Sequence, residues 1–178
     1  MLINRVWAMP SSDTFDIPPI GEFVKSYLRQ SKISVDPFAR NKAWATYTND
    51  LNPKTSAQYH LDAEKFLQTL KDKNVIADLV IFDPPYSPRQ ISECYESMGE
   101  KATTKDTQNA ALYSRVRKAV YPILSPNGIV LSFGWNSAGM GKKGFEILEI
   151  LLVAHGGAHN DTICMAEKRL GSQLDFTS

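Results

Sequence analysis

Residues 76–86 read IADLVIFDPPY, and this stretch limits the possible fold more than any other part of the chain. An almost continuously apolar run of this kind is typical of a strand that is buried on both faces of a parallel sheet. The run leads directly into an aspartate and two prolines, and proline cannot donate to a sheet ladder. The sequence therefore predicts an interior strand that ends abruptly at Asp83 in an acidic turn.

Strand and helix patterns alternate along most of the remaining chain. Strands are predicted within 32–38, 43–53 and 127–135, helices within 20–30 and 108–124, and a brief strand followed by a helix within 57–73. Pro122 is expected to kink or end its helix. Residues 144–169 read as two long strands about the glycine turn HGGAHND, which predicts a hairpin. This order predicts an α/β fold whose sheet is mostly parallel, with an antiparallel C-terminal hairpin.

Length and composition indicate an ordinary globular chain. The 178 residues predict a single domain over 1–178, without a separate domain for target recognition. The formal net charge of +1 creates no strong overall field, so a nucleic-acid substrate would have to meet a local basic patch. Cys94 and Cys164 lie far apart with no metal-binding spacing, and they read as free thiols of a reducing compartment.

The sequence also predicts where the chain acts. No apolar run reaches the roughly 18 residues of a membrane span, and the N-terminus lacks the apolar core of a signal peptide. We therefore expect a cytoplasmic protein that has no membrane partner and no metal site. His155 and His159 flank the hairpin turn, and we expect structural or surface roles for them.

Four aspartates stand just after predicted strands: Asp36, Asp50, Asp62 and Asp83. The carboxyl ends of parallel strands meet at one edge of a sheet, where ligands bind in α/β folds. The pattern therefore predicts that these carboxylates line one crevice. The competing interpretation is that aspartate is simply frequent in turns and helix caps, and Asp62 is also well placed to cap its helix.

The segment Asp83-Pro84-Pro85-Tyr86 matches the DPPY signature of amino-group DNA methyltransferases. These enzymes use S-adenosylmethionine (SAM), and the signature is typical of those that act on N6 of adenine. Other segments resemble the family's motifs in the family's order: PSSDTFDIPPI at 10–20, VDPFARN at 35–41, NDLNP at 49–53, YHLDAEKFL at 59–67 and GGAHNDTICMAEK at 156–168. The resemblance covers nearly the whole chain and is closest to small phage and prophage adenine methyltransferases. It implies a Rossmann-like SAM-dependent methyltransferase fold.

The chain departs from the family's pattern in two places. Ala39-Arg40-Asn41 stands where a glycine-rich turn is usual, which reduces the freedom of the backbone to approach a ligand. There is also no long insert for target recognition. Base selection would then come from short loops, be weak, or depend on a partner.

The resemblance implies that Asp83, Pro84, Pro85 and Tyr86 form the catalytic turn. The adenine amino nitrogen is a poor nucleophile because its lone pair is delocalised into the ring. The Asp83 carboxylate and the Pro84 carbonyl would accept hydrogen bonds from it and stabilise the positive charge that develops. Tyr86 would offer a flat face to a base that must leave the duplex stack. An ordinary strand-to-turn DPP is the alternative.

The resemblance and the charges also imply a SAM site. Its expected residues are Thr14, Phe15, Asp36, Pro37, Phe38, Asp50, Leu51 and Asp62. Asp36 would face the cationic amino group of the methionine part, and Phe38 would pack near the adenosine. Asp50 would accept from the ribose hydroxyls, and Asp62 from the adenine amino group. Thr14 and Phe15 would contact the methionine part, although Phe15 is equally explained as a core aromatic.

A nucleic-acid surface is expected on basic, polar or glycine-rich segments. Its candidate residues are Arg89, Lys101, Lys105, Trp135, Lys142 and Lys143. The cations would contact phosphates, although charged loops are usually just solvated. Trp135 follows a predicted strand and either lines the base pocket or packs in the core.

The leading hypothesis is a SAM-dependent DNA adenine-N6 methyltransferase that acts in a bacterial or phage-infected cell and protects DNA from nucleases, as in restriction-modification. The alternatives are a SAM-binding subunit of a larger complex, methylation of RNA, and methylation of N4 of cytosine. DNA is the expected partner, RNA stays open, and a homodimer or a partner subunit would supply target recognition. A nucleotide-binding oxidoreductase is disfavoured because no GxGxxG turn follows the first strand.

Overall fold

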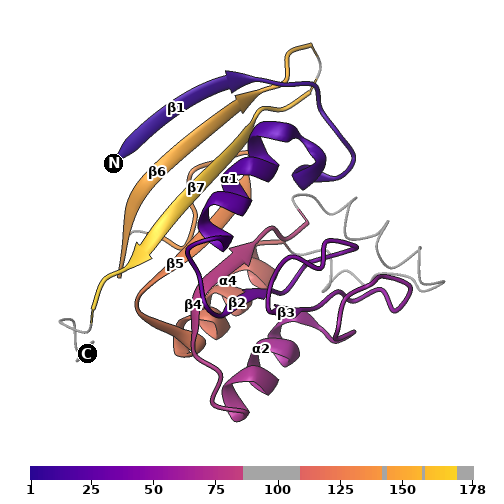
Figure 1. The fold of residues 1–178 in the computed structure, drawn as a ribbon, viewed down its shortest axis with the longest axis vertical. Coiled ribbons are helices and arrows are strands. Elements are labelled where there is room, and N and C mark those ends of the chain that lie inside the picture. Colours follow the sequence, from indigo (N-terminus) through magenta and orange to yellow (C-terminus); the bar gives the residue numbers. More distant parts are fainter. Residues whose placement is uncertain (86–108, 142–143, 158, 172–178) are drawn as a thin grey trace.

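The computed structural model describes residues 1–85, 109–141, 144–157 and 159–171. These residues form a seven-stranded sheet in the order β1-β6-β7-β5-β4-β2-β3 (Figure 1). The strands are β1 (Leu2–Trp7), β2 (Ser34–Asp36), β3 (Tyr47–Thr48), β4 (Ala77–Phe82), β5 (Leu124–Gly134), β6 (Phe145–Ala154) and β7 (Thr162–Arg169). The helices are η1 (Thr14–Asp16), α1 (Pro18–Leu28), α2 (Ala63–Asp72), α4 (Asn109–Val120) and η2 (Tyr121–Ile123).

The sheet is parallel except at β7, which runs antiparallel to both β5 and β6. The predicted C-terminal hairpin is therefore confirmed as β6 and β7. Its turn contains Gly156 and Gly157 at φ 72° and 60°, a conformation that glycine adopts without steric cost. The expected α/β fold with a mostly parallel sheet is thus correct.

β4 is the buried interior strand that its apolar run predicts. It lies between β5 and β2, and both of its faces are covered. Leu79 and Ile81 join the core beneath α1, whereas Val80 and Phe82 join the core beneath α2 and α4. The two cores explain why β4 lacks the alternation of a half-exposed strand.

The helices begin and end where local signals place them. α1 has prolines in its first turn and buries Ile20, Phe23 and Val24 on one side. In α2, the buried residues Phe66, Leu67 and Leu70 follow helical spacing. α4 ends at Val120, and Pro122 lies in the short η2 turn that follows, as expected of a residue that cannot continue the helix.

Two predicted strands are shorter in the structure than their sequence patterns suggest. Of 43–53, only Tyr47–Thr48 forms β3, and the brief strand near 57–61 is reduced to one parallel bridge between Asn49 and Tyr59. Side-chain hydrogen bonds replace part of the sheet ladder here, since Thr46 and Ser34 bond each other's backbone N–H groups.

The edge strand β1 was not anticipated from sequence. It pairs parallel to β6, and its side chains are largely exposed, with Ile3 at 61% and Trp7 at 64%. No helix among the described residues is long and apolar enough to cross a membrane.

Candidate functional site

The strand order reverses between β2 and β4. From β2 the chain moves outward to β3, and it then returns to place β4 on the other side of β2 (Figure 1). Ligands in open α/β sheets bind in the crevice outside the carboxyl ends of the strands at such a point. Asp36 is the last residue of β2 and Asp83 directly follows β4, so both predicted site residues lie at this reversal.

Asp36 is the most deeply buried acid at the site. Its carboxylate is 1% exposed and accepts a hydrogen bond from the Phe38 N–H at 2.9 Å. Burial raises the pKa of Asp36 well above its usual value, the Phe38 N–H opposes this effect, and the charges of Asp83, Asp50 and Asp13 add to it. Four carboxylates therefore share one electrostatic environment, and a cationic ligand group would relieve their mutual repulsion.

Asp50 follows β3 and organises the neighbouring turn. Its two oxygens accept from the Asn52 N–H at 2.8 Å and the Arg40 N–H at 3.1 Å. Burial raises the pKa of Asp50, and these two N–H groups partly offset the rise. Arg40 has a φ of 49°, so the turn that lacks the family's glycines still adopts the left-handed conformation.

Asn49 is a site residue that sequence reasoning missed. It is 1% exposed, and its amide donates to the carbonyls of Pro37 at 3.1 Å and Leu61 at 2.9 Å. Its Oδ1 accepts from the Leu61 N–H at 2.9 Å. One side chain thus joins the turn after β2 to the segment before α2. Its only sequence signal is its position beside Asp50.

Asp62 has a structural role that its position predicts. Its carboxylate caps α2 by accepting from the Glu64 N–H at 3.0 Å and the Lys65 N–H at 3.3 Å. Among the other expected SAM-site residues, Pro37 is buried, and Phe38 and Leu51 are half-buried. Phe38 packs edge-on against Phe82 at the end of β4, with 6.1 Å between ring centroids.

The N-terminal segment around η1 lies near the buried Asp36. Asp13 caps η1 through the Phe15 N–H, and its charge reaches Asp36. Phe15 is 6% exposed and packs against Trp44 and Phe133, at 5.9 and 5.1 Å between centroids, which supports the core interpretation of this aromatic.

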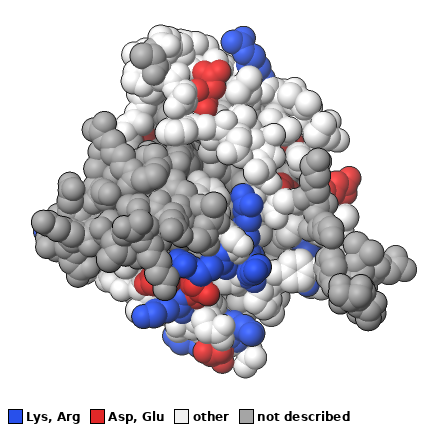
Figure 2. Space-filling view, turned by 180° about the vertical axis from the view of Figure 1, so that it is seen from behind, with Lys and Arg blue, Asp and Glu red and all other residues white. Residues whose placement is uncertain are grey.

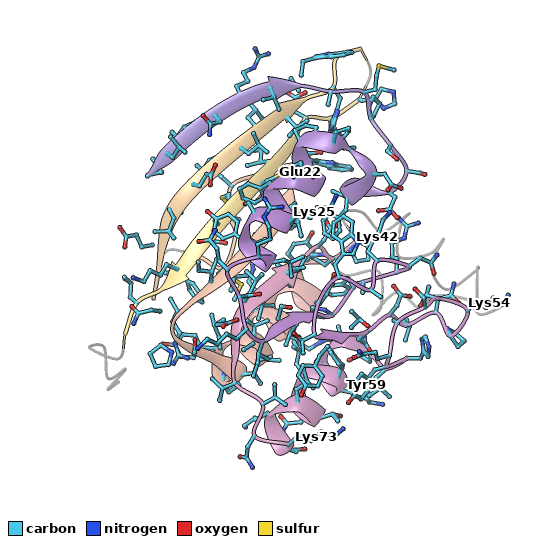
Figure 3. All side chains as sticks on the ribbon, viewed as in Figure 1. Glu22, Lys25, Lys42, Lys54, Tyr59 and Lys73 are labelled. Atoms are coloured by element: carbon cyan, nitrogen blue, oxygen red, sulfur yellow. The ribbon has the colours of Figure 1, made fainter. Side chains whose placement is uncertain are left out.

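Several contacts hold this segment in place. The Arg40 guanidinium donates to the Ser12 carbonyl at 3.0 Å, and Lys42 pairs with Asp16. Lys25 of α1 and Lys42 both lie over the ring of Trp44, on the same side of the molecule (Figure 3). The η1 segment is therefore tied to the turn that follows β2.

The described part of the proposed catalytic turn is Asp83, Pro84 and Pro85. Pro84 is buried, and its two neighbours are half-buried. The Asp83 charge contributes to the raised pKa of Asp36 on β2 and of Cys164 on β7, and to that of Tyr113 on α4, which reaches about 12 mainly through burial. Asp83 thus acts electrostatically on three different elements.

A pocket opens beside this turn. It is lined by Phe82 of β4, by Tyr113 and Arg117 of α4, and by residues 132–136 at the end of β5. Trp135 lines it and is 47% exposed, which favours a place at the pocket over a place in the core.

Glu167 of β7 is a second residue that sequence reasoning missed. It is 2% exposed and accepts from the Ser132 hydroxyl at 2.6 Å and the Met140 N–H at 2.9 Å. Burial raises the pKa of Glu167, and these donors oppose the rise. A Cβ at Gly139 would lie 2.4 Å from the Glu167 carboxylate, so this contact requires glycine in the loop beside the pocket.

The other expectations have mixed outcomes. Tyr86, Arg89, Lys101, Lys105, Lys142 and Lys143 lie outside the described residues. The described part of the chain contains no cluster of three or more potential metal ligands. His155 is structural, since its ring nitrogens lie 2.9 Å from the Ala8 carbonyl and 3.0 Å from the Thr162 hydroxyl.

Basic side chains gather on the face of the molecule opposite the view of Figure 1. Figure 2 shows this concentration of Lys and Arg in the lower half of the far face. α4 packs on the side of the sheet away from α1, and it carries Arg115, Arg117 and Lys118. These cations were not among the residues proposed from the sequence.

Solved structures share this fold at low sequence identity. The candidate methyltransferase SMU.776, in complex with SAH, matches 82% of the chain at 16% identity and a TM-score of 0.57. TrmN of Thermus thermophilus matches 86% of the chain at 14% identity, with a TM-score of 0.58. The candidate methyltransferase yhhF of Escherichia coli matches 92% of the chain at 12% identity, with a TM-score of 0.56. This match covers 91% of the length of yhhF.

The chain spans about half the length of SMU.776 and TrmN, at 48% and 49%. No family model matches the chain, and no curated protein matches its sequence. The structural matches define the class: the chain has the Rossmann-like fold of SAM-dependent methyltransferases.

Proposed function

We propose that this chain transfers a methyl group from SAM to N6 of adenine in DNA. The observation that carries the proposal is the turn Asp83-Pro84, which lies at the carboxyl end of β4 beside the buried Asp36. It combines a carboxylate and a backbone carbonyl at the reversal of the strand order. These two acceptors suit an exocyclic amino group.

The acids at the crevice support SAM as the methyl donor. When bound, SAM supplies an electrophilic methyl group on a cationic sulfonium, next to a cationic amino group. Asp36 lies in the field of Asp13, Asp50 and Asp83, so a bound cation would stabilise its ionised form. Asp50 would accept from the ribose hydroxyls and Asp62 from the adenine amino group. Thr14, Pro37, Phe38 and Leu51 would complete the site. The SAH complex of SMU.776 adds support at the level of the fold.

The proposed reaction needs amino-group activation and charge stabilisation. Asp83 and the Pro84 carbonyl accept hydrogen bonds from the two N6–H groups and draw the nitrogen toward tetrahedral geometry. The nitrogen lone pair then forms the new bond to the methyl carbon while the bond from carbon to sulfur breaks, which leaves SAH. The N6 proton becomes acidic after methylation and passes to Asp83 or to water. Preorganised acceptors of this kind are often the largest catalytic factor.

The pocket beside the turn is the proposed site for an extruded base. Tyr113 and Trp135 line it, and Tyr86 would stack on the base as the fourth residue of the motif. Stacking on an aromatic ring contributes about 1–3 kcal/mol per base and tolerates any sequence. Arg115 and Lys118 of α4 are suitable for phosphate contacts.

The test is mass spectrometry of nucleosides from DNA incubated with protein and SAM. Wild type is compared with Asp83→Ala and with Asp72→Ala, an exposed acid at the end of α2. We expect N6-methyladenine with wild type and Asp72→Ala, and its loss with Asp83→Ala. RNA and cytosine are assayed in parallel, and methylation only of RNA or of N4 of cytosine would replace the proposed substrate.

A subunit that needs a partner is the second candidate. It is favoured by the exposed apolar side chains of the edge strand β1, among them Ile3 and Trp7. Measurable SAM binding without methylation of any of these substrates would support this candidate over the first.

A further inference from the structure

Arg117 is a pocket residue to which the proposed reaction gives no role. It lies on α4 and lines the pocket beside the Asp83 turn. Its guanidinium carbon sits 5.5 Å from the ring centroid of Tyr113, which lines the same pocket. Its Nε is buried and has no hydrogen-bond partner among the residues that the structure describes.

A buried donor without an acceptor is unfavourable and rare in folded proteins. A guanidinium can only donate, so the atom that satisfies it must be an acceptor. The charge of Arg117 lowers the pKa of Glu167, but the Glu167 carboxylate accepts its hydrogen bonds from the Ser132 hydroxyl and the Met140 N–H, and Arg117 Nε donates to no described residue. Because Arg117 lines the pocket, an acceptor on a ligand bound there would be a favourable partner for its guanidinium group.

The adjoining turn offers hydrogen-bond acceptors, in contrast to the donor on Arg117. The Asp83 carboxylate, when ionised, and the Pro84 carbonyl only accept hydrogen bonds. The site thus offers acceptors at the turn and a donor on α4. A complementary ligand carries an amino group with an acceptor atom beside it.

Among the nucleobases, this pattern separates two from the others. Adenine has its N6 amino group between the ring acceptors N1 and N7, and cytosine has its N4 amino group beside the acceptor N3. Guanine and thymine carry a carbonyl oxygen beside a ring N–H at the corresponding edge, which is the reverse arrangement. The polarity of the site therefore selects an amino base.

We propose that Arg117 determines substrate specificity by donating a hydrogen bond to the ring nitrogen beside the reacting amino group. This inference rests on the proposed function, because it assumes that a nucleobase occupies the pocket. It assigns base selection to α4, a helix of the core fold. Tyr113 holds the guanidinium against its ring and limits its movement.

The experiment measures binding of adenosine, 1-deazaadenosine, 7-deazaadenosine and guanosine by NMR titration in the presence of SAH. The proteins are wild type, Arg117→Met, Arg117→Lys and Lys71→Met, an exposed cation in the last turn of α2 that serves as the control. Thermal unfolding of each variant checks its fold. We expect Arg117→Met to bind adenosine about 10- to 100-fold more weakly, the range for loss of a charged hydrogen bond.

The deaza analogues identify the contact. The analogue that lacks the contacted nitrogen should bind wild type with the same low affinity that adenosine shows for Arg117→Met. The substitution Arg117→Met should not lower the affinity for that analogue any further. Sensitivity at position 1 or at position 7 shows which ring nitrogen is contacted. The inference would be overturned if Arg117→Met lowered the affinity for all analogues equally, or did not lower it for any of them.

The binding result and the methylation result are separable. Arg117-dependent binding of adenosine without methyl transfer would leave the inference standing and reject the proposed function. Methyl transfer to adenine without any coupling between Arg117 and a ring nitrogen would support the proposed function and reject the inference about Arg117. Absence of both binding and methylation would reject both.

Discussion

At the scale of single residues, the site concentrates negative charge in a buried position. Asp36 is 1% exposed, and its closest hydrogen-bond donor is the backbone of Phe38 rather than a cationic side chain. Burying a carboxylate in this way costs stability unless a partner compensates. Such a cost is common at binding sites, where function and stability compete.

The first prediction concerns Asp36→Asn. The amide keeps an acceptor for the Phe38 N–H but removes the buried charge, so the free protein should gain about 0.5–2 kcal/mol of stability at pH 7–8. Because burial raises the pKa of Asp36, wild type binds this proton more tightly when folded. The gain should therefore grow as pH rises through the native pKa and vanish below about pH 4, the ordinary aspartate value.

Urea denaturation of both proteins across this pH range measures the effect. SAM affinity should fall in the same variant, because a neutral amide attracts a cation less strongly. A variant that is less stable than wild type at pH 8 would show that the Asp36 charge is compensated in the free protein.

The second prediction concerns Asn49→Ala, which removes three hydrogen bonds from a buried position. The Leu61 N–H and the Pro37 carbonyl would lose their partner, and each unsatisfied buried group costs about 1–3 kcal/mol. We expect a loss of about 2–4 kcal/mol in the free energy of unfolding. Gln68→Ala, which removes one exposed bond to Asp72, is the control and should change stability little.

At the scale of elements, the candidate site is built from strand ends, from the start of α2 and from one face of α4. α2 begins at Asp62, whose carboxylate caps two backbone N–H groups. The loop after β5 is held by Glu167 of β7, and α4 presents Tyr113 and Arg117 to the same pocket. Each of these elements therefore contributes some residues to the candidate site and others to the core.

The third prediction separates the two roles of Asp62. Loss of the cap in Asp62→Ala should cost about 1 kcal/mol of stability, whereas Asp62→Asn should keep the cap because asparagine is an equally good N-cap residue. If Asp62 also accepts from the adenine amino group of SAM, both variants should bind SAM more weakly. Calorimetric titration with SAH and thermal unfolding measure the two effects. Unchanged affinity in both variants would restrict Asp62 to capping.

At the scale of the whole molecule, two cores lie on opposite faces of one sheet. α1 covers one face and α2 and α4 cover the other, with β4 shared between them. The candidate site lies at the carboxyl ends of the paired strands β2 and β4, where the strand order reverses. A ligand bound at this point contacts elements from both halves of the chain, so its binding should stabilise the whole fold.

The fourth prediction follows from that linkage. A ligand that binds only the folded chain stabilises it by about 2.7 kcal/mol at 100 times its Kd. For a chain of this length, this corresponds to a rise of about 5–11 °C in Tm. SAH should produce the rise, and NAD should not, since no GxGxxG turn follows β2. Scanning calorimetry provides the measurement, and Asp36→Ala should lose most of the shift.

Much of this protein was determined by local sequence. The apolar run of β4, its end at Asp83, the cap at Asp62 and the glycine turn between β6 and β7 all depend on residues close in the chain. Backbone restriction by proline, capping geometry and strand periodicity act over a few residues, so a single sequence reveals them. The parallel topology brings strand ends together, and the charges of Asp50 and Asp83 do act on Asp36, whereas Asp62 caps α2.

Only the tertiary structure decided the contacts between distant segments. Asn49 joins Pro37 to Leu61, Ser132 meets Glu167 across 35 positions, and β1 pairs with a strand more than 140 residues away. The pocket that includes Arg117 likewise depends on how α4 packs against β4 and β5. Such contacts leave no periodic pattern in the sequence. They depend on which surfaces meet when the helices pack on the two faces of the sheet.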